Sequence, residues 1–263
     1  MKRLLTCFLI IFVILSFSSC SLFQRSDTKA YAERDVKLIA HRGLSGLEIE
    51  NTASAFIAAG KRSYYGIEAD VRKTADGKFV ICHDDTLERV AGESVEVETS
   101  TLEKLLEVKL LDRNGKEKTD ERLATLEEFI SICKEYGKAA ILELKSSFCD
   151  EEIAAIIDTI EELEYVENVT FISFSYSNLL AVRKILPEQK VQYLFSEVTD
   201  EVIEMLINDG IDASIGFTSL RRRDVKRLHE AGLEVGCWTL DYRILAGYAA
   251  LIGVDYITTN ILE

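Results

Sequence analysis

Short apolar segments alternate with amphipathic segments from residue 36 to the end of the chain, and few architectures accommodate such a pattern. We expect strands over 36–41, 66–71, 139–145, 169–174, 191–195, 211–216, 234–239 and 254–259. We expect helices over 51–62, 126–136, 150–163, 176–185, 199–209, 221–231 and 241–252. Alternating strands and helices produce a parallel sheet, and eight such strands favour a closed barrel. The sequence therefore predicts an α/β fold, a (β/α)8 TIM barrel.

A small excursion interrupts the alternation after the second strand. Asp76-Gly77 indicates a hairpin, with residues 78–83 as the returning strand. Residues 84–123 then exceed the usual length of a connection and are rich in charged side chains. We interpret residues 84–123 as an insertion within one barrel domain that spans residues 35–263.

The first residues of the chain resemble a secretory signal. Two basic residues precede an apolar run over 4–17, which is shorter than the ~20 residues that span a bilayer. Small residues then lead to Cys20, as in a bacterial lipoprotein signal, so residues 1–20 are the predicted signal peptide and Cys20 the lipidated residue. Residues 21–34 are expected to form a polar tether. The predicted form is an extracytoplasmic, membrane-anchored bacterial lipoprotein; a secreted protein or a retained anchor are the alternatives.

Net charge and cysteine content exclude some classes of function. The formal charge of −14 argues against a nucleic-acid binder, because no basic patch exists to recruit a phosphate backbone. An anionic substrate must instead be attracted by a bound cation or by a few local Lys and Arg residues. Export would permit disulfides, but scattered cysteines without CxxC spacing favour buried free thiols. These cysteines are Cys82, Cys133, Cys149 and Cys237.

Side chains able to do chemistry stand at the ends of several expected strands. In a (β/α)8 barrel the carboxyl ends of the strands meet at one mouth, where active sites lie. The residues near these ends are His41, Glu68, Asp70, Glu143, Lys145 and Trp238. We therefore expect them to share one site.

Local rules bring an imidazole to the same place. Glu68 and Asp70 alternate along a strand, so their side chains share a face. If the hairpin loop consists of Asp76 and Gly77 alone, His83 lies directly opposite Asp70. The sequence thus predicts a histidine beside a carboxylate pair.

Three carboxylates without nearby thiolates suit a hard divalent cation, Ca²⁺ or Mg²⁺. They are Glu68, Asp70 and Glu143. The alternative is an exposed acidic pair on an edge strand, with Glu143 paired to Lys145. An acidic pair facing the inside of a buried strand is costly without a counter-charge, which favours the metal.

Basic and aromatic residues complete the candidate site. His41 and His83 are candidates for general base and general acid, because imidazole titrates near neutral pH; the alternative is a structural role. Arg42 and Lys145 would neutralise charge on a phosphoryl group, or else pair with acidic neighbours. Trp238 is expected to form an apolar wall for the alcohol part of a substrate, or to be a core aromatic.

Two further groups are interpreted without a chemical role. Asn51 is interpreted as the N-cap of the first helix. Arg221, Arg222 and Arg223 are interpreted as the solvated start of a helix.

Over residues 36–260 the chain resembles the glycerophosphodiester phosphodiesterases of the PLC-like (β/α)8 superfamily. The motifs that carry the resemblance are His41-Arg42-Gly43, Glu50-Asn51-Thr52, Glu68-Ala69-Asp70-Val71, Thr74-Ala75-Asp76-Gly77, His83-Asp84, Thr125-Leu126-Glu127-Glu128, Glu143-Leu144-Lys145, Ser173-Phe174 and Trp238-Thr239. Each motif is short, and their combination in this order is specific.

The resemblance implies the same site that the strand ends predict. It implies His41 and His83 as the acid/base pair, with Arg42 and Lys145 contacting phosphate. It implies Glu68, Asp70 and Glu143 as the metal ligands.

The chain departs from the family pattern at four positions. Ile49 and Ala124 stand where the family has proline, and Asn260 and Leu262 stand where a terminal TDxP motif has Asp and Pro. None of these departures removes a catalytic group.

The expected activity is metal-dependent hydrolysis of a small glycerophosphodiester to glycerol 3-phosphate and an alcohol. One alternative is a lysophospholipase D or sphingomyelinase D-like phosphodiesterase of the same superfamily, which would release a cyclic phosphate. A second is a non-catalytic lipoprotein that binds phosphodiesters. Direct attack by water and prior attack by a glycerol hydroxyl both remain open.

Overall fold

The structure is a computed structural model, and it describes residues 35–112 and 114–262. The predicted signal peptide, the tether and Cys20 lie outside these residues. Among the described residues, no helix combines the length and the apolar character needed to cross a bilayer.

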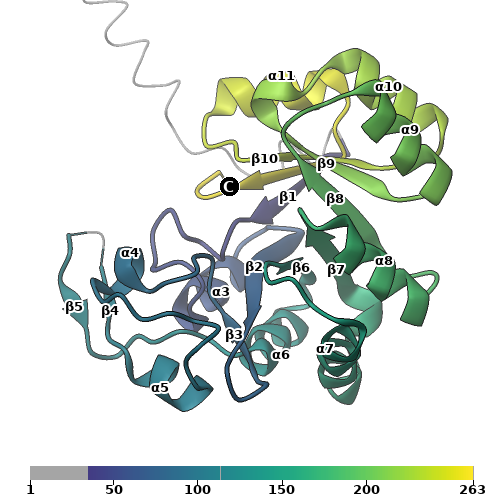
Figure 1. Cartoon of the computed structure of the whole chain (residues 1–263). Coiled ribbons are helices and arrows are strands. Elements are labelled where there is room, and N and C mark those ends of the chain that lie inside the picture. Colours follow the sequence, from purple (N-terminus) through teal and green to yellow (C-terminus); the bar gives the residue numbers. More distant parts are fainter. Residues whose placement is uncertain (1–34, 113, 263) are drawn as a thin grey trace, which may run out of the picture.

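Eight parallel strands form a closed barrel, which confirms the predicted fold (Figure 1). The strands lie around the barrel in chain order, and β1 closes it by pairing with both β11 and β2. They are β1 (Lys37–Ala40), β2 (Gly66–Lys73), β6 (Ala139–Leu144), β7 (Val169–Ser173), β8 (Val191–Phe195), β9 (Asp212–Gly216), β10 (Val235–Trp238) and β11 (Tyr256–Thr259).

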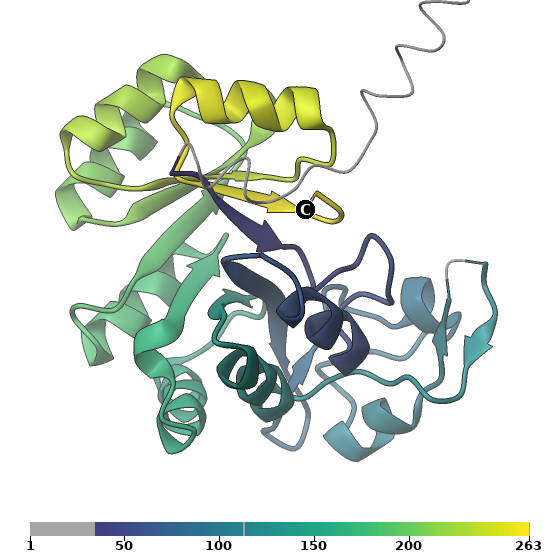
Figure 2. The ribbon, with the colours of Figure 1, turned by 180° about the vertical axis from the view of Figure 1, so that it is seen from behind.

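A helix follows each of the first seven barrel strands and covers the outside of the barrel (Figure 2). These helices are α3 (Ala53–Gly60), α6 (Leu126–Tyr136), α7 (Asp150–Glu162), α8 (Tyr176–Ile185), α9 (Asp200–Asp209), α10 (Arg222–Glu230) and α11 (Arg243–Ile252). Local signals fix their ends. In α6, Thr125 and Glu128 form a capping box, and Gly137 ends the helix in the left-handed region at φ 61°.

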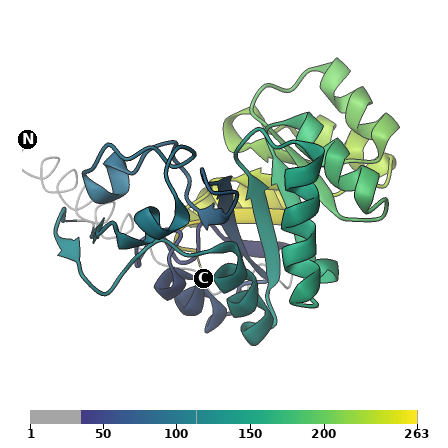
Figure 3. The same cartoon turned by 60° about the horizontal axis from the view of Figure 1, so that its bottom comes forward.

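The predicted excursion lies beside the barrel (Figure 3). Strand β3 (Phe79–Ile81) runs antiparallel to β2, and the chain enters the excursion after β3. The excursion contains α4 (Glu88–Ala91), α5 (Leu102–Glu107) and the antiparallel pair β4 (Leu110–Leu111) and β5 (Glu117–Lys118). It buries an apolar cluster of its own, which includes Val80, Leu87, Val97, Leu105 and Leu123. This cluster explains why a charged connection is ordered at the side of the barrel.

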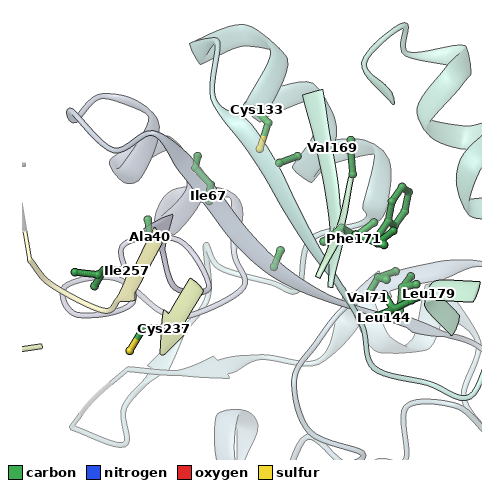
Figure 4. Packing of buried hydrophobic residues seen from close by; sticks show 14 of the residues in the cluster. Ala40, Ile67, Val71, Cys133, Leu144, Val169, Phe171, Leu179, Cys237 and Ile257 are labelled. Carbon is green, nitrogen blue, oxygen red and sulfur yellow. The ribbon is translucent and has the colours of Figure 1, made fainter. Parts of the chain in front are cut away.

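The main core lies between the strands and the helices (Figure 4). Outward-facing side chains such as Ile67, Val71 and Phe171 are fully buried there. A smaller apolar layer, made by Ile39, Ile141, Ile172, Leu194 and Tyr256, lies inside the barrel. Because Ile172 and Leu194 also line a pocket at the carboxyl ends of the strands, this layer forms the pocket's floor.

The cysteines beyond residue 20 are all free thiols in the described structure. Cys82, Cys133 and Cys237 are buried, as predicted. Cys149 is exposed, so the prediction of burial is wrong there. It occupies the N-cap position of α7, where a helix start meets solvent.

Candidate active site

One pocket at the carboxyl ends of the strands gathers nearly all of the predicted site residues. His41, Arg42, Glu68, His83, Glu143, Lys145 and Trp238 all line it. Asp70 does not line the pocket but is fully buried in one cluster with Glu68 and Glu143. Parallel strands bring these residues to one place because each strand ends at the same mouth.

The turn that follows β1 aims two of these residues into the mouth. Arg42 and Gly43 both adopt positive φ, 54° and 76°, so the chain reverses direction immediately after His41. A Cβ on Gly43 would lie 2.7 Å from backbone and side-chain atoms of Ala55, so only glycine fits. The backbone N–H of Arg42 donates to Glu68 Oε2 at 2.7 Å, which fixes the turn onto β2.

The three carboxylates form one buried cluster. Glu68 and Asp70 alternate on β2, and Asp70 is in register with Glu143 on β6. One oxygen from each lies within 4.8 Å of the others. Glu68 is 2 % exposed and Asp70 is fully buried, so the alternative of an exposed acidic pair on an edge strand is wrong.

The cluster has the electrostatics of a cation site. Burial, followed by the charges of Asp70 and Glu143, raises the pKa of Glu68 well above its usual range. Burial and Asp70 raise the pKa of Glu143 to about 7. Glu68 Oε1 and Asp70 Oδ1 are buried and have no hydrogen-bond partner. Oxygen ligands with unsatisfied lone pairs fit a hard divalent cation.

In the absence of divalent cations, the free energy of unfolding is expected to fall as the pH rises from about 4.5 to about 7. The pKa of Glu143 is higher in the folded state than in the unfolded state, so the folded protein binds more protons in this interval. The stability that comes from this proton binding is lost as Glu143 ionises. One pKa unit corresponds to about 1.4 kcal/mol. We expect the Tm of the chelator-treated protein, measured calorimetrically, to fall by roughly 10 °C across the interval, and to fall less when the cation is present.

A matched pair of variants isolates the cluster in that measurement. Asp212, at the opposite end of the barrel, has a pKa that burial raises to about 6 and therefore titrates in the same range. Asp212→Asn should keep the stabilisation by added Ca²⁺ or Mg²⁺, whereas Glu143→Gln should lose most of it. Equal cation responses in the two variants would contradict a cation site at Glu143.

Arg42 and Lys145 lie against the acidic cluster. Arg42 is 3.4 Å from Asp70 and 2.9 Å from Glu50, and Lys145 is 3.0 Å from Glu143. The predicted alternative pairing of Lys145 with Glu143 is therefore present, whereas Arg42 pairs with acidic partners that the sequence analysis did not name. Both side chains also line the pocket, so the same groups can face a substrate phosphate.

The His41 ring is held by a chain of hydrogen bonds from residues that follow β10 and β11. Its Nδ1 lies 2.8 Å from Asn260 Oδ1. The Asn260 amide donates to Asp241 Oδ2 at 2.7 Å, so its oxygen must face the imidazole. His41 Nδ1 then carries the proton, and Nε2, 4.0 Å from Glu68, is left with its lone pair. Burial, and next the charge of Arg42, lower the pKa of His41, which favours the neutral imidazole.

The predicted register of the hairpin is wrong by one residue. The residues of β3 pair as Val71 with Ile81 and Lys73 with Phe79, and Cys82 N donates to the carbonyl of Asp70. His83 is therefore not opposite Asp70. The loop has three residues between Thr74 and Lys78, with Gly77 at φ 70°, where the sequence predicted two.

His83 lines the pocket nevertheless. Strand β3 ends at Ile81, so His83 lies beyond the sheet and is not bound by the alternation of faces along the strand. Its Nδ1 lies 2.6 Å from Asp84 Oδ1, which leaves Nε2 as the other ring nitrogen. Arg72 donates to the His83 carbonyl from Nε and Nη2, at 3.1 and 2.8 Å. Arg72 also pairs with Asp85 at 2.7 Å, so one buried guanidinium fixes the loop that carries the histidine.

Trp238 forms one wall of the pocket together with a residue that the sequence analysis left without a role. The Phe174 ring packs edge-on against Trp238 with centroids 5.5 Å apart, and 48 % of Phe174 is exposed. Trp238 Nε1 donates to the carbonyl of Ser214, which fixes the indole. The result is a rigid apolar surface beside Lys145.

Sequence reasoning also misjudged Asn51. The N-cap of α3 is Thr52, whose hydroxyl accepts from Ala55 N, and α3 begins at Ala53. Asn51 instead donates from Nδ2 to Asp70 Oδ2 at 2.8 Å. It therefore holds a carboxylate of the acidic cluster. Arg72 could have been found from the strand pattern, since it shares a face with Glu68 and Asp70.

Comparison with known proteins gives one consistent result. Residues 41–263 match the Glycerophosphoryl diester phosphodiesterase family. A glycerophosphodiester phosphodiesterase of Caldanaerobacter subterraneus is 29 % identical over 232 residues, covering 85 % of this chain and 93 % of the relative. A solved structure of an Oleispira antarctica phosphodiesterase in complex with the product sn-glycerol-3-phosphate has a TM-score of 0.78 and 28 % identity, covering 85 % of this chain and 92 % of that one. A glycerophosphodiester phosphodiesterase from Parabacteroides distasonis has a TM-score of 0.74 and 25 % identity, covering 86 % and 93 %.

The fold and the matched relatives define a phosphoric diester hydrolase built on a (β/α)8 barrel. The match takes in almost the whole barrel and both histidine motifs. The chain belongs to the glycerophosphoryl diester phosphodiesterase family. The match covers more than nine tenths of both solved relatives, so in those proteins a barrel of this kind folds without a further large domain.

Proposed function

We propose that this phosphodiesterase releases glycerol 3-phosphate by acid/base catalysis between His41 and His83, with Ca²⁺ or Mg²⁺ held by the three carboxylates. The observation that carries the proposal is the meeting of both histidines and the acidic cluster in one pocket. The product seen in the Oleispira structure supports glycerol 3-phosphate as the product here.

Charge on the phosphodiester is matched by the basic side chains at the rim of the cluster. Arg42 and Lys145 contact carboxylates on one side and the pocket on the other, so they can bind the two non-bridging oxygens. A divalent cation, when bound, neutralises the carboxylates and polarises a phosphoryl oxygen. Coordination by carboxylates alone suits both Ca²⁺ and Mg²⁺.

The two histidines have different partners, and the partners suggest their roles. His41 is hydrogen-bonded to a neutral amide and its lowered pKa keeps it unprotonated, so we assign it as the general base at Nε2. His83 has the carboxylate of Asp84 on Nδ1, which can stabilise an imidazolium. We assign it as the general acid that protonates the leaving alkoxide. The nucleophile deprotonated by His41 is water or the neighbouring glycerol hydroxyl.

Trp238 and Phe174 are the proposed binding surface for the carbon skeleton of the substrate. The two rings meet at 81° and expose an apolar face beside Lys145. A glycerol backbone or a short alcohol can lie on such a face while the phosphate contacts the basic side chains.

Replacing Asn260 by aspartate is expected to move the acidic limb of the pH–rate profile upward by about one unit. A carboxylate at 2.8 Å from His41 Nδ1 would stabilise the imidazolium and raise the pKa of the ring. Because the base must be neutral, kcat/KM should then fall at acidic pH and stay near the wild-type value in alkaline solution. A limb at its original position would contradict His41 as the base.

A substrate panel tests the proposed substrate class. Purified protein should hydrolyse glycerophosphocholine and glycerophosphoethanolamine faster than lysophosphatidylcholine or sphingomyelin, and ³¹P NMR should show glycerol 3-phosphate. Faster turnover of a lysolipid with accumulation of a cyclic phosphate would favour the lysophospholipase D or sphingomyelinase D-like alternative. Absence of turnover for all four would favour a phosphodiester-binding lipoprotein.

We also propose that the enzyme is an extracytoplasmic lipoprotein anchored through Cys20, or a secreted protein if the signal is cleaved without lipidation. The charged start, the apolar run and the small residues before Cys20 support this location. Expressed in a bacterium, the wild-type chain should partition into detergent and carry a lipid-modified N-terminus by mass spectrometry. Cys20→Ala should remove the modification; an unmodified wild-type chain would contradict the anchor.

A further inference from the structure

Helix α11 carries an apolar stripe on its outer side. Ile244, Tyr248 and Leu251 are 62 %, 51 % and 69 % exposed. Their spacing of four and three residues places them on one side of the helix, while Ala246, Ala249 and Ile252 pack inward. The inward side already anchors the helix to the barrel, so packing of the fold does not account for the exposed apolar side chains of the outer stripe.

Helix α10 lies beside α11 on the outside of the barrel (Figures 1 and 2). The Phe217 ring, just before α10, meets Tyr248 edge-on with centroids 6.4 Å apart. A groove between the two helices is lined by Arg222, Lys226, Glu230 and Ile252, among others. We call the exposed part of α10 and α11, residues 221–230 and 243–251, the α10–α11 face.

The α10–α11 face is basic although the chain as a whole carries −14. Arg221, Arg222 and Arg243 are exposed and make no ion pair with any residue in 35–112 or 114–262. On the side away from α11, by contrast, Arg227 pairs with Asp200 and Glu204 of α9. Positive charge without a local partner is therefore concentrated beside the apolar stripe.

We propose that the α10–α11 face docks onto an anionic lipid surface. An aromatic and aliphatic stripe flanked by arginines matches the boundary between acyl chains and anionic headgroups. A nucleic acid would satisfy the arginines but leave the apolar stripe in water. A two-fold dimer through this face would set like charges against each other, because the same patch occurs on both copies.

Docking in this way would also orient the active site. Arg222 follows the carboxyl end of β9 and Arg243 follows that of β10, so the basic ends of both helices lie on the pocket side of the barrel. The pocket mouth would then be held close to the lipid surface. This orientation uses none of the residues 1–34 and is independent of the proposed anchor at Cys20.

The test uses residues 35–263, which correspond to the complete barrel of the solved relatives, in flotation with phosphatidylglycerol-containing vesicles and with pure phosphatidylcholine vesicles. The segment should bind the anionic vesicles at low salt and bind the neutral ones at least tenfold less. Arg221→Gln/Arg222→Gln/Arg243→Gln and Ile244→Ser/Leu251→Ser should each weaken binding to anionic vesicles by about tenfold or more. Lys78→Gln/Lys109→Gln/Lys116→Gln removes as many exposed charges elsewhere and should bind like the wild type.

Three results would overturn the proposal. One is failure of the wild-type segment to bind anionic vesicles, and a second is an equal loss in both charge-removed variants. The third is a wild-type segment that forms a dimer in light scattering and does not bind vesicles, where Ile244→Ser/Leu251→Ser abolishes the dimer. Hydrolysis of soluble glycerophosphocholine should be unchanged in all these variants, so a failure of docking is distinguishable from a failure of the proposed catalysis.

Discussion

Glu68→Gln is expected to lower kcat/KM for glycerophosphocholine by about 10³-fold. Glu68 is central to the proposed site, because its carboxylate faces Asp70 and Glu143, accepts the Arg42 backbone N–H at 2.7 Å and lies 4.0 Å from His41 Nε2. Glutamine preserves the shape but removes one ligand charge from the cluster. Steady-state kinetics and calorimetric titration with Ca²⁺ and Mg²⁺ should both show the loss.

Asp212→Asn is the matched control for that variant. Asp212 is a largely buried carboxylate on the same barrel, but it lies at the opposite end from the pocket and accepts the Glu234 backbone N–H. It should leave cation affinity and kcat/KM close to wild type. Undiminished cation binding or turnover in Glu68→Gln would contradict the assignment of the metal ligands.

His83→Ala is expected to lower kcat for glycerophosphocholine by about 10³-fold, within the usual range for loss of a general acid. Its imidazole lies 2.6 Å from the Asp84 carboxylate and lines the same pocket as the proposed base. Cation binding and Tm should stay near the wild-type values, because His83 contributes to neither the acidic cluster nor the core.

Two substrates that differ in their leaving group distinguish the roles of the two histidines. A p-nitrophenyl phosphodiester releases an anion that needs no proton, so His83→Ala should lose less than about tenfold on it. His41→Ala should be impaired on both substrates, since the nucleophile must still be deprotonated. If both variants respond alike to the change of leaving group, the assignment of base and acid is wrong.

The barrel is predictable from sequence because its signals repeat. Each strand is a short apolar run, each helix has a capping residue or an amphipathic face, and their alternation leaves little freedom of topology. The mouth follows from the same regularity, since Asp70 and Glu143 lie in register on neighbouring parallel strands.

The register of the hairpin depends on contacts that local sequence does not reveal. Asp76 Oδ1 accepts from both Thr74 Oγ1 and Leu102 N, so the loop is tied to the start of α5. This long-range contact favours the three-residue loop over the shorter one. A shift of one residue moves a strand's side chains to the other face. His83 reaches the pocket only because β3 ends before it.

The supporting residues of the site were also beyond local reasoning. Asn260 and Asp241 reach His41 across the closure of the barrel, through contacts between residues far apart in the chain. Asn51 carries a capping residue's signature, yet Thr52 takes that position and frees Asn51 for Asp70. Such roles depend on which strands become neighbours.

The most direct test of the account is ³¹P NMR of glycerophosphocholine incubated with the purified chain. With Ca²⁺ or Mg²⁺ present, the phosphodiester signal should be replaced by that of glycerol 3-phosphate. EDTA should stop the conversion, and excess cation should restore it in the wild type but not in Glu68→Gln. Conversion that persists in EDTA, or that Glu68→Gln retains at the wild-type rate, would contradict a cation-dependent phosphodiesterase centred on these carboxylates.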